Sequence, residues 1–525
     1  MKHEENFRRI QHDGYNHPED QYTQIDTSLF DLSHSRLMTF DMGELVPMLN
    51  MEILPNDYIE LKTDSLIRLA PLVAPLFHHL TLETRYYFVP NRLIWNEAGA
   101  SFTDFITGGE NGTDATVAPT FGATTYQEGS LADYLGIPIE VSLSVSALPF
   151  RAYNLIYNEF YRNEDVQTAL TNSTNDGVDS TSNQALKNVN WSDAGDYFVG
   201  ASETLQRGTA VTLPLGTSAN VLYSTTSTNS PLIRYSSNNA LAGAHDLVAN
   251  ASSELVENIT KTKIDPNSTL YADLSTATAA TIQSIREASA TQILYELLQK
   301  GGSRYRNYIS TIFGVTDYED ARFQIPEILG GKTSSVVVSE VLSTNGASGG
   351  ALGQMGGHGI APQQTETIKH KFKEHGILLG LMFVKPEAMY QEGLHKMWTR
   401  TARLDYAHPQ LALIGDQPIL NKELYAAHSA PTGTFAYQRR FAEYMSIPST
   451  VHADFRSEAD TPLEYWHLAR DFAADPSFNS TFLTCDPDKA RIFTSSSTDC
   501  VYAQIVHYIT ARRPIPKPDK PYKLI

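Results

Sequence analysis

The sequence predicts an all-β fold with long loop insertions and few helices. Most apolar residues occur in short runs that end at Pro, Asn, Asp or Gly, which is the pattern of strands joined by turns. Only 19% of the 525 residues are charged, and the chain contains 27 tyrosines and 22 phenylalanines. Such a composition favours strands and large buried interfaces over long exposed helices. We therefore expect a jelly roll with elaborated loops rather than a parallel α/β enzyme.

The first strands follow a polar N-terminal segment. Residues 1–28 are rich in His and poor in apolar residues, so we expect an arm that orders only against a partner. From Thr39 the sequence changes to short apolar or alternating runs, at 39–63 and 79–90. These runs predict strands. In the second run, alternation places four side chains on one face: Leu80, Leu82, Tyr86 and Phe88.

Two helices interrupt this pattern. Residues 148–165 place Tyr153, Ile156 and Phe160 at helical spacing after a proline, which predicts a helix. Residues 281–302 predict an amphipathic helix that Gly301 ends. Its apolar stripe consists of Ile282, Ile285, Ile293, Leu294, Leu297 and Leu298.

Between the two helices lies a variable-looking segment, residues 166–280, dominated by Ser, Thr, Asn, Ala and Gly. It could be a disordered linker or an insertion with its own sparse strands. Residues 197–224 retain strand-like apolar clusters, so we favour an ordered surface insertion.

The C-terminal half returns to strands at 334–343 and 375–386. Seven glycines between Gly346 and Gly359 predict a connection that turns tightly or rearranges as neighbouring subunits close around it. Residues 511–525 form a basic tail with four prolines, which we expect to be too extended to pack as a strand.

Two motifs in the glycine-rich region resemble catalytic signatures, and neither has the required context. Lys332 and Thr333 follow Gly331 as in a phosphate-binding loop, but the glycine required six residues before the lysine is replaced by Pro326. Ser348 lies in a G-x-S-x-G sequence, but the glycines that follow it do not form the helix of a hydrolase elbow. We expect no catalytic residues.

Metal and cofactor sites are not predicted either. His370 and His375 are five residues apart and His78 and His79 are adjacent, yet no metal-ligand spacing occurs. Cys485 and Cys500 are too few for a disulfide framework, which leaves a single bridge open. There is neither a secretory signal nor an apolar run long enough to span a membrane.

Basic residues cluster locally although the formal net charge is −19. Arg and Lys beside aromatic rings can hold single-stranded nucleic acid by charge and stacking, but Arg and Tyr are equally favoured at protein interfaces. For each patch we favour an interface, and the tail is the better candidate for lying along a neighbour or a genome. The candidate nucleic-acid contacts are Arg304, Arg306, Arg439, Arg440, Arg512, Arg513, Lys517, Lys520 and Lys523.

Long blocks of the sequence resemble the major capsid protein of Microviridae, particularly the gokushovirus branch. The first block runs from "FDLSHSRLMTFDMGELVPML" to "RYYFVPNRLIWNE", and later blocks include "LPFRAYNLIYNEFYRNED", "GGSRYRNYISTIFGV", "EHGILLGLMFVKPEAMYQEGLHKMWTRTARLDYAHPQLALIGDQPILNKELY" and "FAYQRRFAEYM". They occur in family order within residues 29–165 and 281–470.

The resemblance implies a single eight-stranded antiparallel jelly roll over residues 29–525. It implies a structural protein that self-assembles into a T=1 icosahedral shell around circular single-stranded DNA of a small bacteriophage. The expected place is the virion, assembled in the bacterial host cytoplasm, with other phage structural proteins as partners. The 166–280 insertion is then the candidate for threefold protrusions that contact a host receptor.

Two other functions remain open from the residues alone. A surface carbohydrate-binding or adhesin protein would use the Ser/Thr/Asn-rich insertion, and a serine hydrolase would use Ser348.

Overall fold

The computed structural model describes residues 27–108, 116–192, 195–209, 211, 324–342, 353 and 355–515, with residues 220–223, 233–235, 262–264, 270–273, 282–301 and 311. Two units are distinguished by their internal contacts. One combines Met1–Leu205 with Gly302–Ile525, and the other is Gln206–Gly301.

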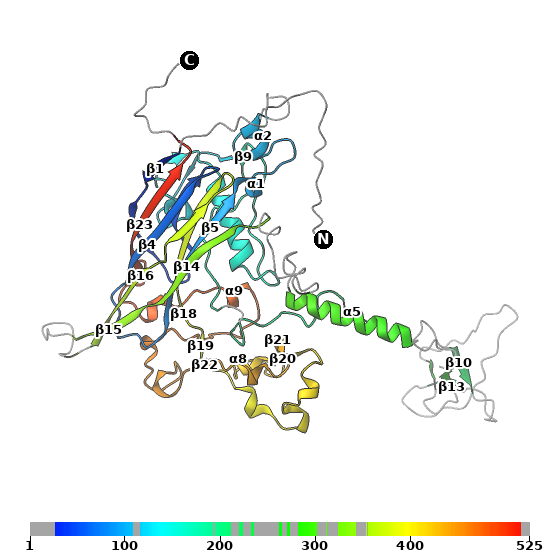
Figure 1. Ribbon diagram of the computed structural model, residues 1–525. Coiled ribbons are helices and arrows are strands. Elements are labelled where there is room, and N and C mark those ends of the chain that lie inside the picture. The colour runs from blue at the N-terminus through cyan, green and yellow to red at the C-terminus, as the bar shows by residue number, and fades with distance from the viewer. Residues whose placement is uncertain are drawn as a thin grey trace, which may run out of the picture. The chain divides into compact units, whose positions relative to one another are not determined.

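Seven antiparallel strands form the larger sheet of the first unit. Their order is β1-β23-β4-β16-β15, with β2 also paired to β23 and β17 also paired to β4. Figure 1 shows β23, β4 and β16 side by side. The bounds are β1 Ser28–Asp31, β2 His34–Phe40, β4 Tyr58–Leu69, β15 Val337–Leu342, β16 Met355–Gln364, β17 Ile368–Lys371 and β23 Val501–Arg513.

Four antiparallel strands form the second sheet, in the order β14-β5-β18-β3. The strand β18 is an almost uninterrupted apolar run in which ten of eleven residues are buried. Such a run is typical of a strand that is covered on both faces. The bounds are β3 Val46–Ile53, β5 Leu80–Pro90, β14 Glu327–Ser335 and β18 Gly376–Pro386.

The two faces of the four-stranded sheet line two different cores. Side chains at alternate positions of β18, such as Leu378 and Met382, pack with Ile67 of β4 and Ile505 of β23 in a core between the two sheets. The intervening side chains, such as Leu379, pack into a second core. Among the described residues, a core therefore covers one face of the seven-stranded sheet and both faces of the strands β5 and β18. The edge strand β14 has no buried residue.

Short helices and irregular chain build the second core. The helix α4 begins with Pro149 in its first turn, where a missing N–H is tolerated, and continues as one π-helical turn, η1. The helices here are α1 Asn91–Ile94, α2 Phe102–Thr107, α3 Leu131–Leu135, α4 Leu148–Ile156, η1 Tyr157–Tyr161 and α9 Ser480–Leu483.

A buried ion pair holds this layer together. The Arg151 guanidinium lies 2.8 Å from the carboxylate of Asp179, and both side chains are fully buried. Arg151 also donates to the carbonyl oxygens of Ile94 and Asn175. Burial acts to raise the pKa of Asp179, but hydrogen bonds from Ser182, Thr181 and Arg151 lower it to about 2.

The remaining described elements of the first unit are short. Two-residue strands pair as β6 with β9, β7 with β8 and β19 with β22, and β20 pairs with β21. Their bounds are β6 Thr120–Phe121, β7 Thr124–Thr125, β8 Ser142–Leu143, β9 Val178–Asp179, β19 Met389–Tyr390, β20 Asp416–Leu420, β21 Thr434–Arg439 and β22 Ser449–Thr450. The short helices are η2 Lys396–Thr399, η3 Arg403–Asp405, η4 Pro409–Leu411, α8 Asn421–Leu424, η5 Ala442–Tyr444, η6 Ala453–Phe455, η7 Glu464–Trp466 and η8 Lys489–Arg491.

The second unit contains the helix α5 and two strand pairs. The strands β10 (Asn220–Tyr223) and β13 (Leu270–Asp273) pair antiparallel, as do β11 (Ile233–Tyr235) and β12 (Thr262–Ile264). The helix spans Ile282–Gly301, as predicted. Several residues of its apolar stripe are exposed: Ile285, Ile293, Leu294 and Leu297.

The predicted 166–280 insertion is divided by this architecture. Residues 166–205 belong to the first unit, where Trp191, Tyr197, Phe198 and Val199 are buried in the second core. The separate unit begins only at Gln206. The strand-like apolar clusters in this part of the sequence therefore belong to two structures. Some of their residues pack in the core of the first unit, and others form the small strands of the second unit.

The runs predicted as strands at 39–63, 79–90 and 375–386 contain β3, β5, β18 and the first part of β4, and the all-β class with few helices is confirmed. The interpretation of the glycine-rich region as a connection is wrong for Met355–Gln364, which forms β16. Gly357 is needed there because an added Cβ would lie 2.7 Å from the carbonyl oxygen of Ala74. The strand β23 extends to Arg513, so the first three residues of the predicted tail belong to the sheet.

Candidate assembly and nucleic-acid surfaces

We use the name open face for the side of the seven-stranded sheet that is not covered by a core of described residues. Burial alternates along β23 and along β4, so every second side chain of each strand points away from the core. On β23 the outward residues include Tyr502, Gln504, Tyr508, Thr510 and Arg512, and on β4 they include Tyr58, Glu60, Lys62, Asp64, Leu66 and Arg68.

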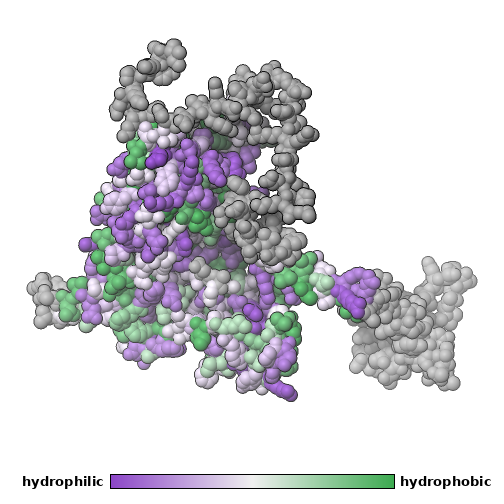
Figure 2. Space-filling view, in the orientation of Figure 1, coloured by the Kyte–Doolittle hydropathy of each residue, from purple (hydrophilic) through white to green (hydrophobic). Residues whose placement is uncertain are grey.

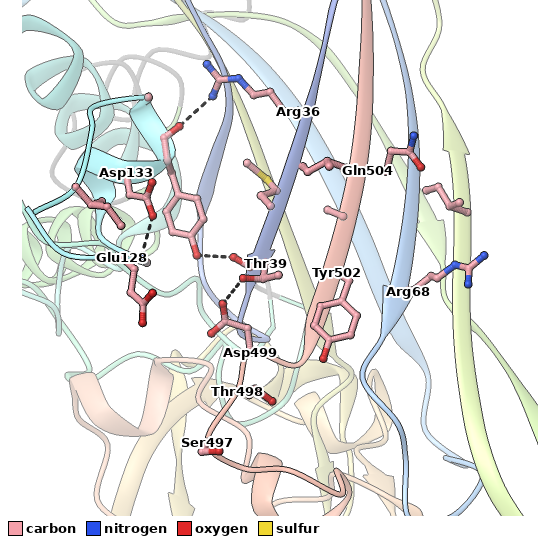
Figure 3. A pocket seen from close by; sticks show the side chains of 18 residues that line it. Arg36, Thr39, Arg68, Glu128, Asp133, Ser497, Thr498, Asp499, Tyr502 and Gln504 are labelled. Atoms are coloured by element: carbon pink, nitrogen blue, oxygen red, sulfur yellow. Dashed lines mark hydrogen bonds between the residues drawn. The ribbon is translucent and has the colours of Figure 1, made fainter.

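One end of the open face is hollowed into a cavity of about 1200 Å³ (Figure 3). Tyr134 donates to the backbone oxygen of Thr39 at 2.7 Å, and the Thr39 hydroxyl donates to Asp499 at 2.6 Å. Arg36 donates to the carbonyl oxygen of Tyr134 at 3.0 Å. Charges of both signs line the cavity, with Arg68 on one wall and Asp499 on another, so it has no single-sign anion site.

The predicted basic residues at the end of β23 have different environments. Arg512 is exposed on the open face, opposite Tyr58. Arg513 points the other way, where its guanidinium lies 3.3 Å from the buried carboxylate of Asp57 and donates to the Glu52 carbonyl oxygen at 2.8 Å. The charge of Arg513 is thus compensated within the subunit, whereas that of Arg512 faces solvent.

The other predicted basic residues do not all lie in the described part of the chain. Arg439 is exposed at the end of β21, and the guanidinium of Arg440 lies 5.3 Å from the ring of Phe441. Five residues lie outside the described residues: Arg304, Arg306, Lys517, Lys520 and Lys523. Sequence reasoning missed the cations on β4, because Lys62 and Arg68 are far from any basic cluster in the sequence.

A second surface, which we call the apolar lobe, comprises residues 392–416 and 444–447. No residue from 392 to 416 is buried, yet this stretch carries Trp398, which is 71% exposed, and Leu413, which is 89% exposed. Hydrophobic residues reach the surface of the lower part of the molecule in the view of Figure 2. The other large exposed apolar side chains of the lobe are Leu394, Met397, Leu404, Tyr406, Ile414, Tyr444, Met445 and Ile447.

Internal ion pairs hold the backbone of the apolar lobe. Arg400 lies 3.0 Å from Glu443, and its guanidinium is stacked 4.3 Å from the ring centre of Tyr444. Lys396 lies 3.8 Å from the buried carboxylate of Glu423. Polar contacts therefore fix the lobe in place while its apolar side chains stay uncovered, which is how a preformed protein interface is built.

The described residues do not support the catalytic and metal-binding motifs that the sequence resembles. Lys332 and Thr333 lie within the strand β14 and not at a helix start, while Ser348 lies outside the described residues. Among the described residues there is no group of three metal-ligating side chains. Cys485 and Cys500 are both free and buried, so the bridge left open by the sequence does not form.

The histidines singled out in the sequence contact different partners and do not form one cluster. Burial lowers the pKa of His78 to about 4, and its Nε2 lies 2.7 Å from the Glu387 carbonyl oxygen. His79 contacts the Ser335 hydroxyl instead, and His370 lies 3.6 Å from Glu327. None of the described helices is long and apolar enough to cross a bilayer.

Comparison with known proteins identifies the family. Residues 20–522 match the family described as "Capsid protein (F protein)". The chain is 34% identical over 497 residues to "Capsid protein VP1" of Bdellovibrio phage phiMH2K, which covers 90% of this chain and 91% of the relative. It is 31% identical to "Capsid protein VP1" of Chlamydia phage 1, covering 87% and 89%, and 28% identical to that of Spiroplasma virus 4, covering 88% of each. The chain therefore belongs to the phage capsid protein family, as a structural virion protein of the gokushovirus-like Microviridae and not as an enzyme.

Proposed function

We propose that the chain self-assembles, in the cytoplasm of a bacterial host, into a T=1 icosahedral shell around a circular single-stranded DNA genome. The observation that carries this proposal is the apolar lobe, whose residues 392–416 contain no buried position of their own. A stretch with this many exposed large apolar side chains is stable in water when a neighbour covers it. In a shell, that neighbour is another copy of the same chain.

We propose further that the two sheets form a single eight-stranded jelly roll. The strand orders β2-β23-β4-β16 and β3-β18-β5-β14 support this assignment. In chain order, β2, β3, β4 and β5 alternate between the sheets, and β14, β16, β18 and β23 do so again. Two interlocked Greek keys produce this arrangement. Of the added strands, β15 widens the larger sheet beyond β16, while β1 continues β2 along β23 and β17 continues β16 along β4.

The separate unit Gln206–Gly301 is our candidate for the surface protrusion and for host attachment. Exposed apolar side chains along α5, among them Ile293 and Leu297, support a contact with other copies of this unit. Deletion of residues 206–280 should leave the shell intact and abolish adsorption to host cells. Unchanged adsorption would remove host attachment from the proposal.

The tail and the end of β23 are our candidates for contact with the genome. Neutralising Arg512, Lys517, Lys520 and Lys523 should reduce packaged DNA while empty shells still form. Arg513→Gln should instead destabilise the subunit, because it leaves the buried Asp57 without its cation.

Electron microscopy of purified particles tests the shell directly. The wild-type chain should form small icosahedra, and Leu413→Lys combined with Ile447→Lys should give folded subunits that do not assemble, because both side chains are exposed on the apolar lobe. Val178→Lys, at an exposed apolar position outside the lobe, is the matched control and should assemble normally. A wild-type chain that stays monomeric with genome and phage partners present would contradict the proposal.

A further inference from the structure

The strand register brings tyrosines and cations together in pairs on the open face. Across the β23–β4 ladder, Tyr502 is opposite Arg68, Tyr508 is opposite Lys62, and Arg512 is opposite Tyr58. Opposed residues of antiparallel strands point to the same face with Cβ atoms about 4.5–5.5 Å apart. Each pair therefore presents one aromatic ring and one positive charge side by side.

The three pairs lie in a line. Six residues of β23 separate the first pair from the second, and four separate the second from the third. At about 3.3 Å per residue, the line is roughly 33 Å long. It runs toward the end of β23, after which the basic residues of the tail follow in the sequence.

These side chains are available for a ligand. Tyr502 is 39% exposed and Tyr508 is 49% exposed. Among the described residues, none of the cations Lys62, Arg68 and Arg512 has an ion-pair partner. This differs from Arg151 and Arg513, which pair with Asp179 and Asp57 within the subunit.

The charge of the open face is opposite to that of the chain. Its described strands carry five outward cations, Lys62, Arg68, Lys369, Lys371 and Arg512, and three outward carboxylates, Asp31, Glu60 and Asp64. The chain as a whole has a net charge of −19. A net positive sheet on an acidic protein is complementary to a polyanion.

We propose that the three tyrosine–cation pairs of the open face bind single-stranded nucleic acid, with bases stacked on the tyrosines and phosphates beside the cations. This inference rests on the proposed genome-enclosing function and assigns the surface that faces the genome. Stacking on tyrosine is tolerant of base identity, so one strip accepts any stretch of a genome. A protein neighbour fits less well, because it would bury three cations that the subunit does not neutralise. The apolar lobe, with Arg400 already paired to Glu443, has the opposite character.

Ultraviolet cross-linking of filled particles, followed by peptide mass spectrometry, tests the contact. Nucleotide adducts are expected on peptides that contain Tyr502 and Tyr508. Tyr406 and Tyr444 of the apolar lobe are comparably exposed and serve as the matched controls without adducts. The absence of adducts at both Tyr502 and Tyr508 would overturn the inference.

Binding of fluorescent oligo(dT) to subunits released from particles gives a quantitative test. Lys62→Gln with Arg68→Gln should lower the slope of log affinity against log salt by about 1.4, since each single-strand phosphate contact contributes about 0.7. Tyr502→Ala with Tyr508→Ala should weaken binding by roughly tenfold or more and leave the slope unchanged. Arg403→Gln and Tyr406→Ala on the apolar lobe are the controls. Wild-type affinity and slope in both double variants would overturn the inference.

Electron microscopy of the same variants separates this inference from the proposed function. If variant shells form and retain DNA as firmly as wild-type shells, the open face is not the genome contact, although the shell function stands. If the wild-type chain forms no shell, the shell function fails whatever the oligonucleotide results are. Equal protection of the open face in empty and filled shells would assign it to a protein contact and overturn the inference.

Discussion

The two sheets of the first unit have opposite relationships to their surroundings. In the four-stranded sheet β14-β5-β18-β3, the central strands β5 and β18 are buried on both faces, between the inter-sheet core and the layer of short helices, whereas the edge strand β14 has no buried residue. The seven-stranded sheet buries one face and presents the other to solvent. The side chains of β5 and β18 therefore stabilise the subunit itself. The outward residues of the seven-stranded sheet contribute little to folding and are free to serve assembly or binding.

This contrast predicts where substitutions destabilise the subunit and where they affect only the particle.

The largest effect is expected in the layer that covers the four-stranded sheet. Asp179→Ala leaves the fully buried Arg151 guanidinium without its carboxylate, so the free energy of unfolding should fall by about 3–5 kcal/mol. Glu374→Ala is the matched control: it breaks the Arg92–Glu374 pair, in which both side chains are about one-third exposed, and should cost less than about 1 kcal/mol. Urea unfolding of released subunits measures both, and equal costs would contradict the contrast.

A leucine comparison tests the two sheets directly. Leu379 of β18 is 0% exposed and Leu37 of β2 is 81% exposed. Leu379→Ala should reduce the free energy of unfolding by about 2–5 kcal/mol because it leaves a cavity. Leu37→Ala should change it by less than about 0.5 kcal/mol. A large loss of unfolding free energy in the Leu37 variant would show that another part of the same chain covers the open face.

The buried link between the sheets predicts a pH dependence. His507 of β23 lies 3.0 Å from the Met48 carbonyl oxygen of β3 and 2.8 Å from the Thr63 hydroxyl. Burial lowers the pKa of His507 to about 4, opposed by the Met48 contact and aided by His34 and Arg36. The unfolded chain takes up this proton near pH 6.5. The contribution of neutral His507 to the free energy of unfolding is therefore complete above pH 6.5, and it declines by up to about 3 kcal/mol as the pH falls to 4.

Comparison of variants isolates this contribution. Burial raises the pKa of Glu44 to about 7, which has the opposite effect on stability over the same pH range. The wild-type profile is therefore a sum of opposing terms. His507→Gln should flatten the loss of stability between pH 6.5 and 4 relative to wild type, whereas His79→Gln, at an exposed position, should not. Parallel profiles for wild type and His507→Gln would contradict the assignment.

The smallest effect on the isolated subunit is expected in the apolar lobe. Trp398→Ala should change the free energy of unfolding by less than about 0.5 kcal/mol, because the side chain packs little within the subunit. Shell yield should nevertheless fall strongly, since exposed tryptophans are frequent hot spots of interfaces. Trp95→Ala, at a fully buried position, should instead destabilise the subunit itself. Normal shell yield from the Trp398 variant would remove this residue from the subunit contact.

The sequence was sufficient for elements whose pattern is local. Leu80, Leu82, Tyr86 and Phe88 do share the inter-sheet core, and the apolar run at 375–386 forms β18. The helices at α4 and α5 were also predicted correctly. Each of these follows from a periodicity within one segment.

Elements that depend on distant partners were missed. The strand β16 was not predicted because it is rich in glycine. These glycines let Leu69 and Ala74 approach the strand closely, and such an approach leaves no pattern of side chains in the sequence. The strand β23 is different, because the alternation of Val501, Ala503, Ile505 and Ile509 is a local signal that the prediction of a C-terminal tail did not use. The pairs on the open face require the register of β23 against β4, which a sequence alone does not supply.

The central claim is that the apolar lobe and the open face are covered by different partners. Hydroxyl-radical footprinting of released subunits, empty shells and filled particles tests it most directly. Trp398, Leu404 and Tyr406 should be reactive in subunits and protected in both kinds of shell, while Tyr502 and Tyr508 should be protected only in filled particles. Undiminished reactivity of the lobe in assembled shells would contradict the account.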